Sequence, residues 1–513
     1  MISAPGAPDR QREVLLIRKL VSSHLGESFY PCFYSSKGGT RIEVEKRILR
    51  RTFLKGTALA GATLLLAACA PKAEPTTVPA VAAVKEATPA PVEKVELEVW
   101  TGWTEAMAQR IEKILGDYTE SQDRVIAKHV VIPENMTQRL LASISAGNPP
   151  GTAVVFGASI AYQLAAQEGV LALDEVGKPE QIAALKEWME PALWDLGVYE
   201  GKFYYASMWN QCYATFVNTK MCKEKGVDPD KPPQTLEELD QVWDKLTTYF
   251  PDGNIDILGG DWTWFAPIMA RFLGKYVSED GKTILANDPG TLKALEWITA
   301  RYKRIGPQKL QDYYSSLAGA EERSAGLDPF CAGLRATYNT GPWHFDTIIK
   351  FAPEGFEYTV WPWPRPAGVT EWGMYTYGDG WIIPKGCPNV DAAWDLIGAL
   401  TGATGDKDVY TSLFITWLCV NGPVSRKILD WPLFKSGVIG SCPGYKEIFL
   451  KDLFESDYYL YPPKIPTSVS YTSLMGAECE KARLGQKTPK EALDFVTEQA
   501  QKELDEWYAQ KGG

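Results

Sequence analysis

The sequence predicts an α/β body with a mainly parallel sheet, preceded by an export signal and a tether. After residue 94, short apolar runs of strand length alternate with helical patterns, which is typical of α/β proteins. The 513 residues are 45% hydrophobic and 23% charged, as in globular chains of two to four domains. The apolar run before residue 69 is too short to span a membrane as a helix.

The acidic charge of the body excludes a nucleic-acid binder. The formal net charge is −11, and from residue 69 onward the chain holds 42 of the 53 basic and 59 of the 64 acidic residues. Phosphate contacts need a basic face. With only three histidines, we expect neither a histidine metal site nor a cofactor. The 18 tryptophans and 24 tyrosines favour flat, partly apolar ligands.

Residues 1–68 contain the export signal. The segment Arg50-Arg51-Thr52-Phe53-Leu54-Lys55 resembles the twin-arginine motif, and the apolar run 56–68 follows it. Leu66-Ala67-Ala68-Cys69 resembles the lipoprotein box, in which the cysteine is lipidated. We therefore expect an exported lipoprotein anchored at Cys69, with a buried helix and a chance cysteine as the alternative. Residues 1–43 show no domain pattern, and we expect translation to begin near Val44.

Residues 69–94 are expected to form the lipidated cysteine and an extended tether. The 25 residues after Cys69 contain five prolines and seven alanines and no periodic apolar face.

Nine cysteines occur without a Cys-x-x-Cys or Cys/His cluster, so structural zinc is not expected. Pairing of Cys212 with Cys222 outside the cell stays open at this point.

The body begins with elements of clear period. Val95, Leu97 and Val99 alternate with glutamates and predict a strand that ends at Trp100. The next expected elements are a helix over 105–116, a strand over 129–132, a helix that ends before Asn148-Pro149-Pro150, and a buried strand over 153–156. Capping boxes at Thr235-Leu-Glu-Glu238 and Thr488-Pro-Lys-Glu491 predict the starts of two later helices.

Five segments in order resemble family 1 extracellular solute-binding proteins, the maltose-binding-protein type. They cover about residues 95–510 and are Tyr199–Asn218, Phe330–Trp343, Asp379–Gly386, Asn421–Arg426 and Gly485–Leu493. One departure is Gly151, where many relatives carry aspartate, and this puts the local turn in doubt.

The resemblance implies a two-lobed, type II periplasmic-binding-protein-like fold with three hinge crossings, near 207–212, 338–341 and 378–381. Lobe 1 is then residues 95–208 and 342–378, and lobe 2 is residues 212–338 and 382–513. The implied role is capture of a carbohydrate in the cleft between the lobes, expected to be an oligosaccharide, and its delivery to ABC permease subunits by a monomer.

Carried over segment by segment, the resemblance implies a ligand site without catalytic residues. A sugar offers CH faces to aromatic rings and hydroxyls to amides and carboxylates. The expected ligand-binding residues are Trp103, Thr104, Glu105, Ser159, Trp209, Asn210, Gln211, Trp262, Trp264, Trp343, Asp379 and Tyr471. Each aromatic ring has packing in a lobe core as its alternative. Trp361, Trp363 and His129 fit the core better, and His344 can approach the cleft beside Trp343.

Two other functions stay open. A secreted carbohydrate-active enzyme would need two carboxylates across the cleft, and the expected set offers only Glu105 and Asp379. The same scaffold could bind a peptide or a polyamine, which the negative charge permits, whereas the tryptophans favour sugars.

Overall fold

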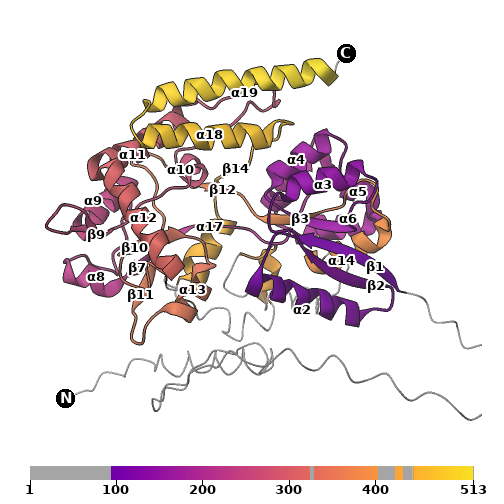
Figure 1. Cartoon of the computed structure of the whole chain (residues 1–513), viewed down its shortest axis with the longest axis horizontal. Helices are drawn as coiled ribbons and strands as arrows, with labels where there is room; N and C mark the ends of the chain where they lie inside the picture. The colour runs from indigo at the N-terminus through magenta and orange to yellow at the C-terminus, as the bar shows by residue number, and fades with distance from the viewer. Residues whose placement is uncertain (1–93, 324–327, 403–421, 431–441, 443, 512–513) are drawn as a thin grey trace, which may run out of the picture. The chain divides into compact units, whose positions relative to one another are not determined.

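A computed structural model describes residues 94–323, 328–402, 422–430, 442 and 444–511 (Figure 1). The expected export signal, Cys69 and nearly all of the expected tether lie outside the described residues. Among the helices that the model describes, none combines the length and the apolar character that crossing a membrane requires.

A five-stranded sheet organises the first lobe, which we define as residues 94–208, 379–402 and 422–430. Its strand order is β2-β1-β3-β13-β6, with parallel pairing of β1 to β2 and β3, and antiparallel pairing of β13 to β3 and β6. The strands are β1 (Val95–Thr101), β2 (Val125–Val131), β3 (Thr152–Phe156), β6 (Ala206–Ser207) and β13 (Asp379–Ile382). Leu97 and Val99 are buried while Glu96 and Glu98 are exposed, so the alternation in β1 is confirmed.

Helices cover this sheet and close the first hydrophobic core. They are α2 (Glu105–Ser121), α3 (Met136–Ser145), α4 (Ala158–Ala166), α5 (Leu173–Val176), α6 (Pro179–Trp188), α7 (Pro191–Gly197) and α14 (Val390–Thr401), with the hairpin β4 (Val198–Tyr199) and β5 (Lys202–Phe203). Gly151, just before β3, lies against Leu97, and a Cβ atom there would overlap the leucine side chain. Aspartate therefore does not fit this turn without rearrangement.

The second lobe, defined as residues 212–375 and 445–511, contains a three-stranded antiparallel sheet of order β10-β7-β11. Two small pairs accompany it, β12 with β14 and β8 with β9. The strands are β7 (Ala214–Asn218), β8 (Thr248–Tyr249), β9 (Ile255–Ile257), β10 (Thr337–Thr340), β11 (Tyr358–Pro362), β12 (Gly373–Tyr375) and β14 (Tyr458–Leu460).

The helices of the second lobe include a long pair, α18 and α19, that run side by side (Figure 1). The helices are α8 (Thr219–Glu224), α9 (Leu236–Leu246), α10 (Phe265–Arg271), α11 (Pro289–Ile305), α12 (Pro307–Arg323), α13 (His344–Phe351), η3 (Tyr445–Leu450), α17 (Lys451–Phe454), α18 (Ser468–Arg483) and α19 (Pro489–Lys511); η2 (Arg426–Asp430) belongs to the first lobe.

Both predicted helix starts are confirmed by an N-cap hydrogen bond, but the box at Thr235 is not reciprocal, because Glu238 accepts from Gln234 N at 2.7 Å. The Thr235 hydroxyl accepts from Glu238 N at 3.1 Å at the start of α9. At the start of α19 the pair is reciprocal, because Thr488 Oγ1 accepts from Glu491 N and Glu491 accepts from Thr488 N at 2.8 Å.

Strand β7 lies between the two cores. Phe216 on one of its faces joins the core that continues from the first sheet, and Val217 on the other face joins the core of the second lobe. Cys212 and Cys222 are both buried free thiols, one in each core, so the structure contains no bond between them.

The lobe boundaries differ from the expected ones. Strand β11 pairs with β7, which places most of the segment 342–378 in the second lobe. Strand β13 pairs with β3, and α14 packs on α5 and α6, which places 379–402 in the first lobe. The connections therefore lie at 207–213, at 375–380 and after residue 430, whereas residues 338–341 stay within the sheet of β7.

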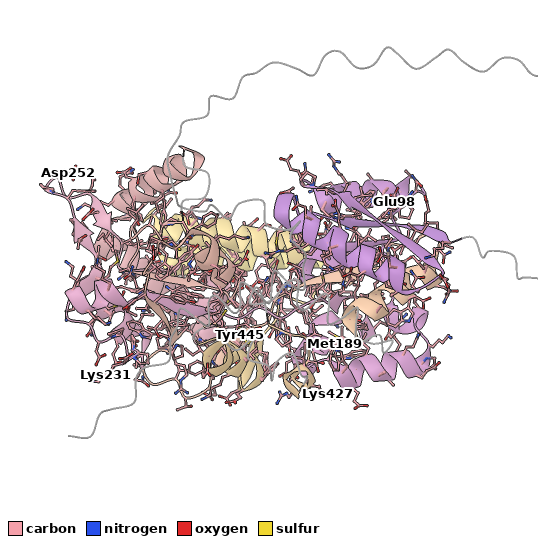
Figure 2. The ribbon with its side chains drawn as sticks, turned by 90° about the horizontal axis from the view of Figure 1, so that it is seen from below. Glu98, Met189, Lys231, Asp252, Lys427 and Tyr445 are labelled. Carbon is pink, nitrogen blue, oxygen red and sulfur yellow. The ribbon has the colours of Figure 1, made fainter. Side chains whose placement is uncertain are left out.

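Residues 422–430 belong to the first lobe. Arg426 forms a two-pronged ion pair with Glu190, at 2.7 Å for Nη2 to Oε2, and Lys427 pairs with Glu187 at 2.9 Å. Figure 2 labels Lys427 and Met189, which lie in neighbouring segments on this side of the first lobe. By Tyr445 the chain packs against Phe345 of the second lobe.

Candidate functional site

The connections between the lobes lie side by side as backbone. Met208 N donates to Asp379 O at 2.8 Å, and Gln211 N donates to Tyr377 O at 2.9 Å. Asn210 and Gly422 exchange two backbone hydrogen bonds, of 2.9 and 2.8 Å. Residues of the first two connections are therefore in direct contact with each other and with the segment that leads to the third.

A group of three aromatic rings lies at the end of the first sheet. The Trp103 ring lies 5.5 Å from both the Phe156 ring and the Trp209 ring, measured between centroids. Trp103 follows β1 and Phe156 ends β3, so the parallel order of these strands brings both rings to one edge of the sheet. Trp209 is buried, Trp103 is half-buried, and Phe156 keeps 43% of its surface exposed.

The Asp379 carboxyl lies beside this group. Asp379 is directly opposite Phe156 in the antiparallel pairing of β13 with β3, so both side chains stand on the same face of the sheet. Asp379 is 8% exposed, and burial raises the pKa of its carboxyl to about 7. Within the described part of the chain, no hydrogen bond or ion pair to this carboxyl is formed. A buried carboxyl without a donor favours its neutral form.

A second aromatic group surrounds Tyr213. The rings of Trp264, Trp262 and Trp343 contact the Tyr213 ring edge-on at 5.1, 5.5 and 5.9 Å. The Tyr213 hydroxyl donates to Gln211 Oε1 at 3.2 Å, which ties this group to the first connection. Burial raises the pKa of Tyr213 well above its ordinary value, so its hydroxyl stays a neutral donor.

Two tyrosines of the second connection extend this group. Trp264, which is 38% exposed, contacts the rings of Tyr375 and Tyr377 edge-on, at 5.6 Å each. The ring of Tyr377 also lies against Gly157, which follows Phe156 in the first lobe. Tyr377 therefore contacts both lobes.

The ring of Trp343 folds back over the backbone before it. A Cβ atom at Gly341 would overlap the Trp343 ring, so only glycine allows this position of the ring. Trp343 is half-buried and packs against both cores. The Gly341-Pro342-Trp343 sequence thus sets a ring between the second-lobe sheet and Tyr213.

Buried polar atoms without a partner lie along the same connections. The Asn210 side chain is fully buried, and among the described residues neither its amide oxygen nor its amide nitrogen has a hydrogen-bond partner. The hydroxyls of Ser207 and Thr376 share this state. A buried polar group without a hydrogen bond costs free energy, so such groups are suited to a ligand or to ordered water.

The structure brings most of the expected site residues together. Trp103, Trp209 and Asp379 form the first-lobe part, Asn210 and Gln211 lie on the first connection, and Trp262, Trp264 and Trp343 meet at Tyr213. In the stacked pair of Trp262 with Trp363, the centroids are 4.5 Å apart, and Trp262 is buried.

Three expected residues occupy helix starts near this set. Thr104 is exposed and caps α2 with its backbone carbonyl, and Glu105 is the first residue of that helix. Ser159 is half-buried in the first turn of α4, next to the Gly157 that contacts Tyr377.

Tyr471 lies apart from this set. It is fully buried in the second core, and its hydroxyl donates to Tyr276 O at 2.9 Å.

His344 is packed among the rings of Phe216, Phe330 and Tyr338, and burial lowers its pKa to about 4. His129 Nε2 is 2.7 Å from the Thr101 hydroxyl, inside the first lobe. Trp361 is fully buried and donates to Pro229 O at 2.7 Å.

Sequence reasoning missed Phe156, Tyr213, Tyr375 and Tyr377. The run 153–156 was expected to be a buried strand, but the Phe156 ring is exposed at the strand end. The alternation of Tyr375 and Tyr377 in the second connection is a usable signal, because residues two apart in extended backbone share a face.

Aromatic faces, an unpartnered amide and an unpartnered carboxyl together suit a ligand with CH faces and many hydroxyls. Among the described residues, no group of three or more histidine, cysteine, aspartate or glutamate side chains could hold a metal ion.

Comparison with family models matches residues 113–417, more than half of the chain, to the bacterial extracellular solute-binding proteins. No curated protein matches the sequence.

Solved structures similar to this one include CpMnBP1 with mannotriose bound, at 22% sequence identity and a TM-score of 0.65, covering 79% of this chain and 100% of that chain. An ABC substrate-binding protein from Listeria monocytogenes in complex with cycloalternan matches at 17% identity, a TM-score of 0.61, and coverage of 80% and 100%. The sugar-binding protein MalE from Xanthomonas citri matches at 17% identity, a TM-score of 0.61, and coverage of 81% and 98%. These similarities confirm the two-lobed fold.

Proposed function

Since the chain belongs to the bacterial extracellular solute-binding proteins, we propose that it captures a neutral oligosaccharide between its lobes and delivers it to an ABC importer. The observation that carries the proposal is the meeting of two aromatic groups with unpartnered polar side chains at the connections between the lobes. Similar structures hold mannotriose and cycloalternan, which are oligosaccharides.

The proposed site uses each group for one part of a sugar. The rings of Phe156, Trp103 and Trp264 supply flat apolar faces for the CH surfaces of successive sugar units. The Asn210 amide and the Asp379 carboxyl supply the acceptors and donors for hydroxyl groups. Such a combination of apolar faces and few polar groups is typical of small-molecule sites.

The proposal includes no catalytic step. Hydrolysis of a glycosidic bond uses two carboxyl groups about 5 to 9.5 Å apart. Asp379 is the carboxyl that the described side chains contribute to this set, and its surroundings are rings and tyrosine hydroxyls. We propose a binding protein that works as a monomer and is held at the outer face of the membrane by a lipid on Cys69.

Calorimetry tests the proposal directly. The purified chain is titrated at pH 8 with mannotriose, maltotriose and cycloalternan, and with spermidine and trialanine as non-sugar solutes. We expect saturable 1:1 binding of at least one oligosaccharide, and no release of smaller sugars on chromatography after prolonged incubation. Binding of spermidine or trialanine alone would overturn the assignment of the ligand class, and release of smaller sugars would establish an enzyme.

A further inference from the structure

The Asp379 carboxyl occupies a position that favours proton exchange on ligand binding. Asp379 is the first residue of β13 and lies within the second connection, and its side chain stands on the same face of the sheet as the exposed Phe156 ring of the neighbouring strand. Asp379 is 8% exposed, and its pairing with Phe156 places its side chain next to that ring on the same face of the sheet. No described donor satisfies it.

The groups around this carboxyl are neutral. Strand β3 contributes no titratable residue. Tyr205, on the segment before β6, interacts electrostatically with Asp379 and donates its hydroxyl to Gly378 O. Tyr377, on the segment before β13, and Tyr213, on the segment before β7, also interact with Asp379. Burial raises the pKa values of all three tyrosines well above their ordinary value, so none becomes charged near neutral pH.

No described cation offsets the burial. Burial is the cause of the raised pKa of Asp379, about 7, and no lysine, arginine or histidine contributes an opposing effect. In the ligand-free protein near neutral pH, the carboxyl is therefore present in both its neutral and its ionised form. Its ionised form has two oxygens that accept hydrogen bonds, and none of the described residues donates to them.

We propose that ligand binding and deprotonation of Asp379 are coupled: a sugar hydroxyl donates to the Asp379 carboxylate, and the proton that the carboxyl carried is released to solvent. This inference rests on the proposed function, because the donor is a hydroxyl of the bound sugar. The balance is simple: the O–H bond of the carboxyl breaks, its proton leaves to buffer, and the sugar hydroxyl keeps its own proton while it forms a hydrogen bond to the carboxylate.

The association constant for the sugar is expected to rise with pH, because binding and proton release are linked. A hydrogen bond to the ionised form lowers the pKa of the carboxyl in the complex below its value in the free protein. Binding then competes with protons wherever the free protein is protonated. The association constant is expected to rise about tenfold from pH 6 to pH 8 and to level off above pH 8, since a pKa shift and an affinity change are linked.

The test is calorimetric titration with mannotriose and maltotriose at pH 6, 7 and 8, in pairs of buffers with different ionisation enthalpies. For wild type we expect release of close to one proton at pH 6, about half a proton at pH 7 and almost none at pH 8. Asp379→Asn removes the titrating group, so its affinity should be independent of pH and its proton release absent. Asp312→Asn, an exposed aspartate on α12, is the matched control and should behave as wild type.

The outcomes distinguish failure of the proton coupling from failure of the proposed function. Sugar binding whose affinity and proton balance do not change with pH overturns the proton coupling and leaves the proposed function in place. Proton uptake, with affinity that falls as pH rises, means that the neutral carboxyl donates to the sugar, and it also overturns the inference. Binding of neither sugar, nor of cycloalternan, at any pH removes the proposed function and this inference with it. Because Asp379→Asn is close in size, its fold is checked by circular dichroism and by its melting temperature.

Discussion

The exposed ring of Phe156 should contribute to sugar affinity far more than to stability. Truncation of a fully buried phenylalanine to alanine costs about 3–5 kcal/mol of stability. Phe156 keeps 43% of its surface exposed, and among the described residues its one ring contact is with Trp103, so we expect a loss of about 1–2 kcal/mol for Phe156→Ala. By analogy with base stacking, a lost stacking ring costs about 1–3 kcal/mol of binding, or about 5- to 150-fold in affinity.

Phe351→Ala is the matched control for this experiment. Phe351 is 45% exposed, almost as much as Phe156, and it is the last residue of α13 in the second lobe. Melting temperatures without ligand should fall by similar amounts in the two variants, and only Phe156→Ala should lose affinity for mannotriose or maltotriose in calorimetry. Equal affinities for the two variants, with Phe156→Ala far less stable than Phe351→Ala, would refute the assignment of Phe156 to the site.

Three further changes have expected outcomes. Trp343→Ala should weaken sugar binding about 5- to 150-fold and cost less stability than the roughly 3–5 kcal/mol of a core tryptophan, as measured by calorimetry and by melting. The pKa of Asp379 is 3.8 ordinarily and about 7 in the folded protein. At pH values between these two, the folded protein holds a proton on Asp379 that the unfolded chain has released, so the contribution of Asp379 to stability falls as the pH rises through this range. Asp379→Asn should therefore gain stability relative to wild type from pH 4.5 to pH 8 in urea titrations; an unchanged difference would contradict the shift. Cys69→Ala should leave the protein in the soluble fraction after cell disruption, and its retention on membranes after a high-salt wash would contradict lipid anchoring at this residue.

Local elements were predictable because their causes are local. The alternation around Leu97 gave the strand, and Thr488 with Glu491 gave the start of α19 through two hydrogen bonds within one turn. The position of β11 was not predictable in the same way. Its pairing with β7 joins residues at least 140 positions apart, and nothing in the segment 358–362 itself specifies which sheet it joins.

In the candidate site too, residues set by local sequence were predictable, and those that depend on distant segments were not. The family resemblance located Trp209, Asn210 and Asp379 at connections, and their backbones do lie there, because the sequence context of each connection is recognisable. Tyr213 was missed because its role depends on three tryptophans that reach it from two other segments. Tyr471 was expected in the site from its distance after a proline, but a single spacing does not fix which face of α18 meets the core.

The polar groups of the candidate site lie on the connections, whereas its exposed rings lie on the two lobes. Asn210 and Gln211 lie on the first connection, and its backbone is hydrogen-bonded to Tyr377 of the second connection and to Gly422. We therefore expect these polar groups to keep their positions relative to the second connection when the lobes rotate. Phe156 belongs to the first lobe and Trp264 to the second, so their separation changes with any hinge motion. A ligand can favour the closed state only through contacts that differ between the two states. We therefore infer that the rings of the two lobes supply the free energy of closure, while the polar groups of the connections select which sugar is held.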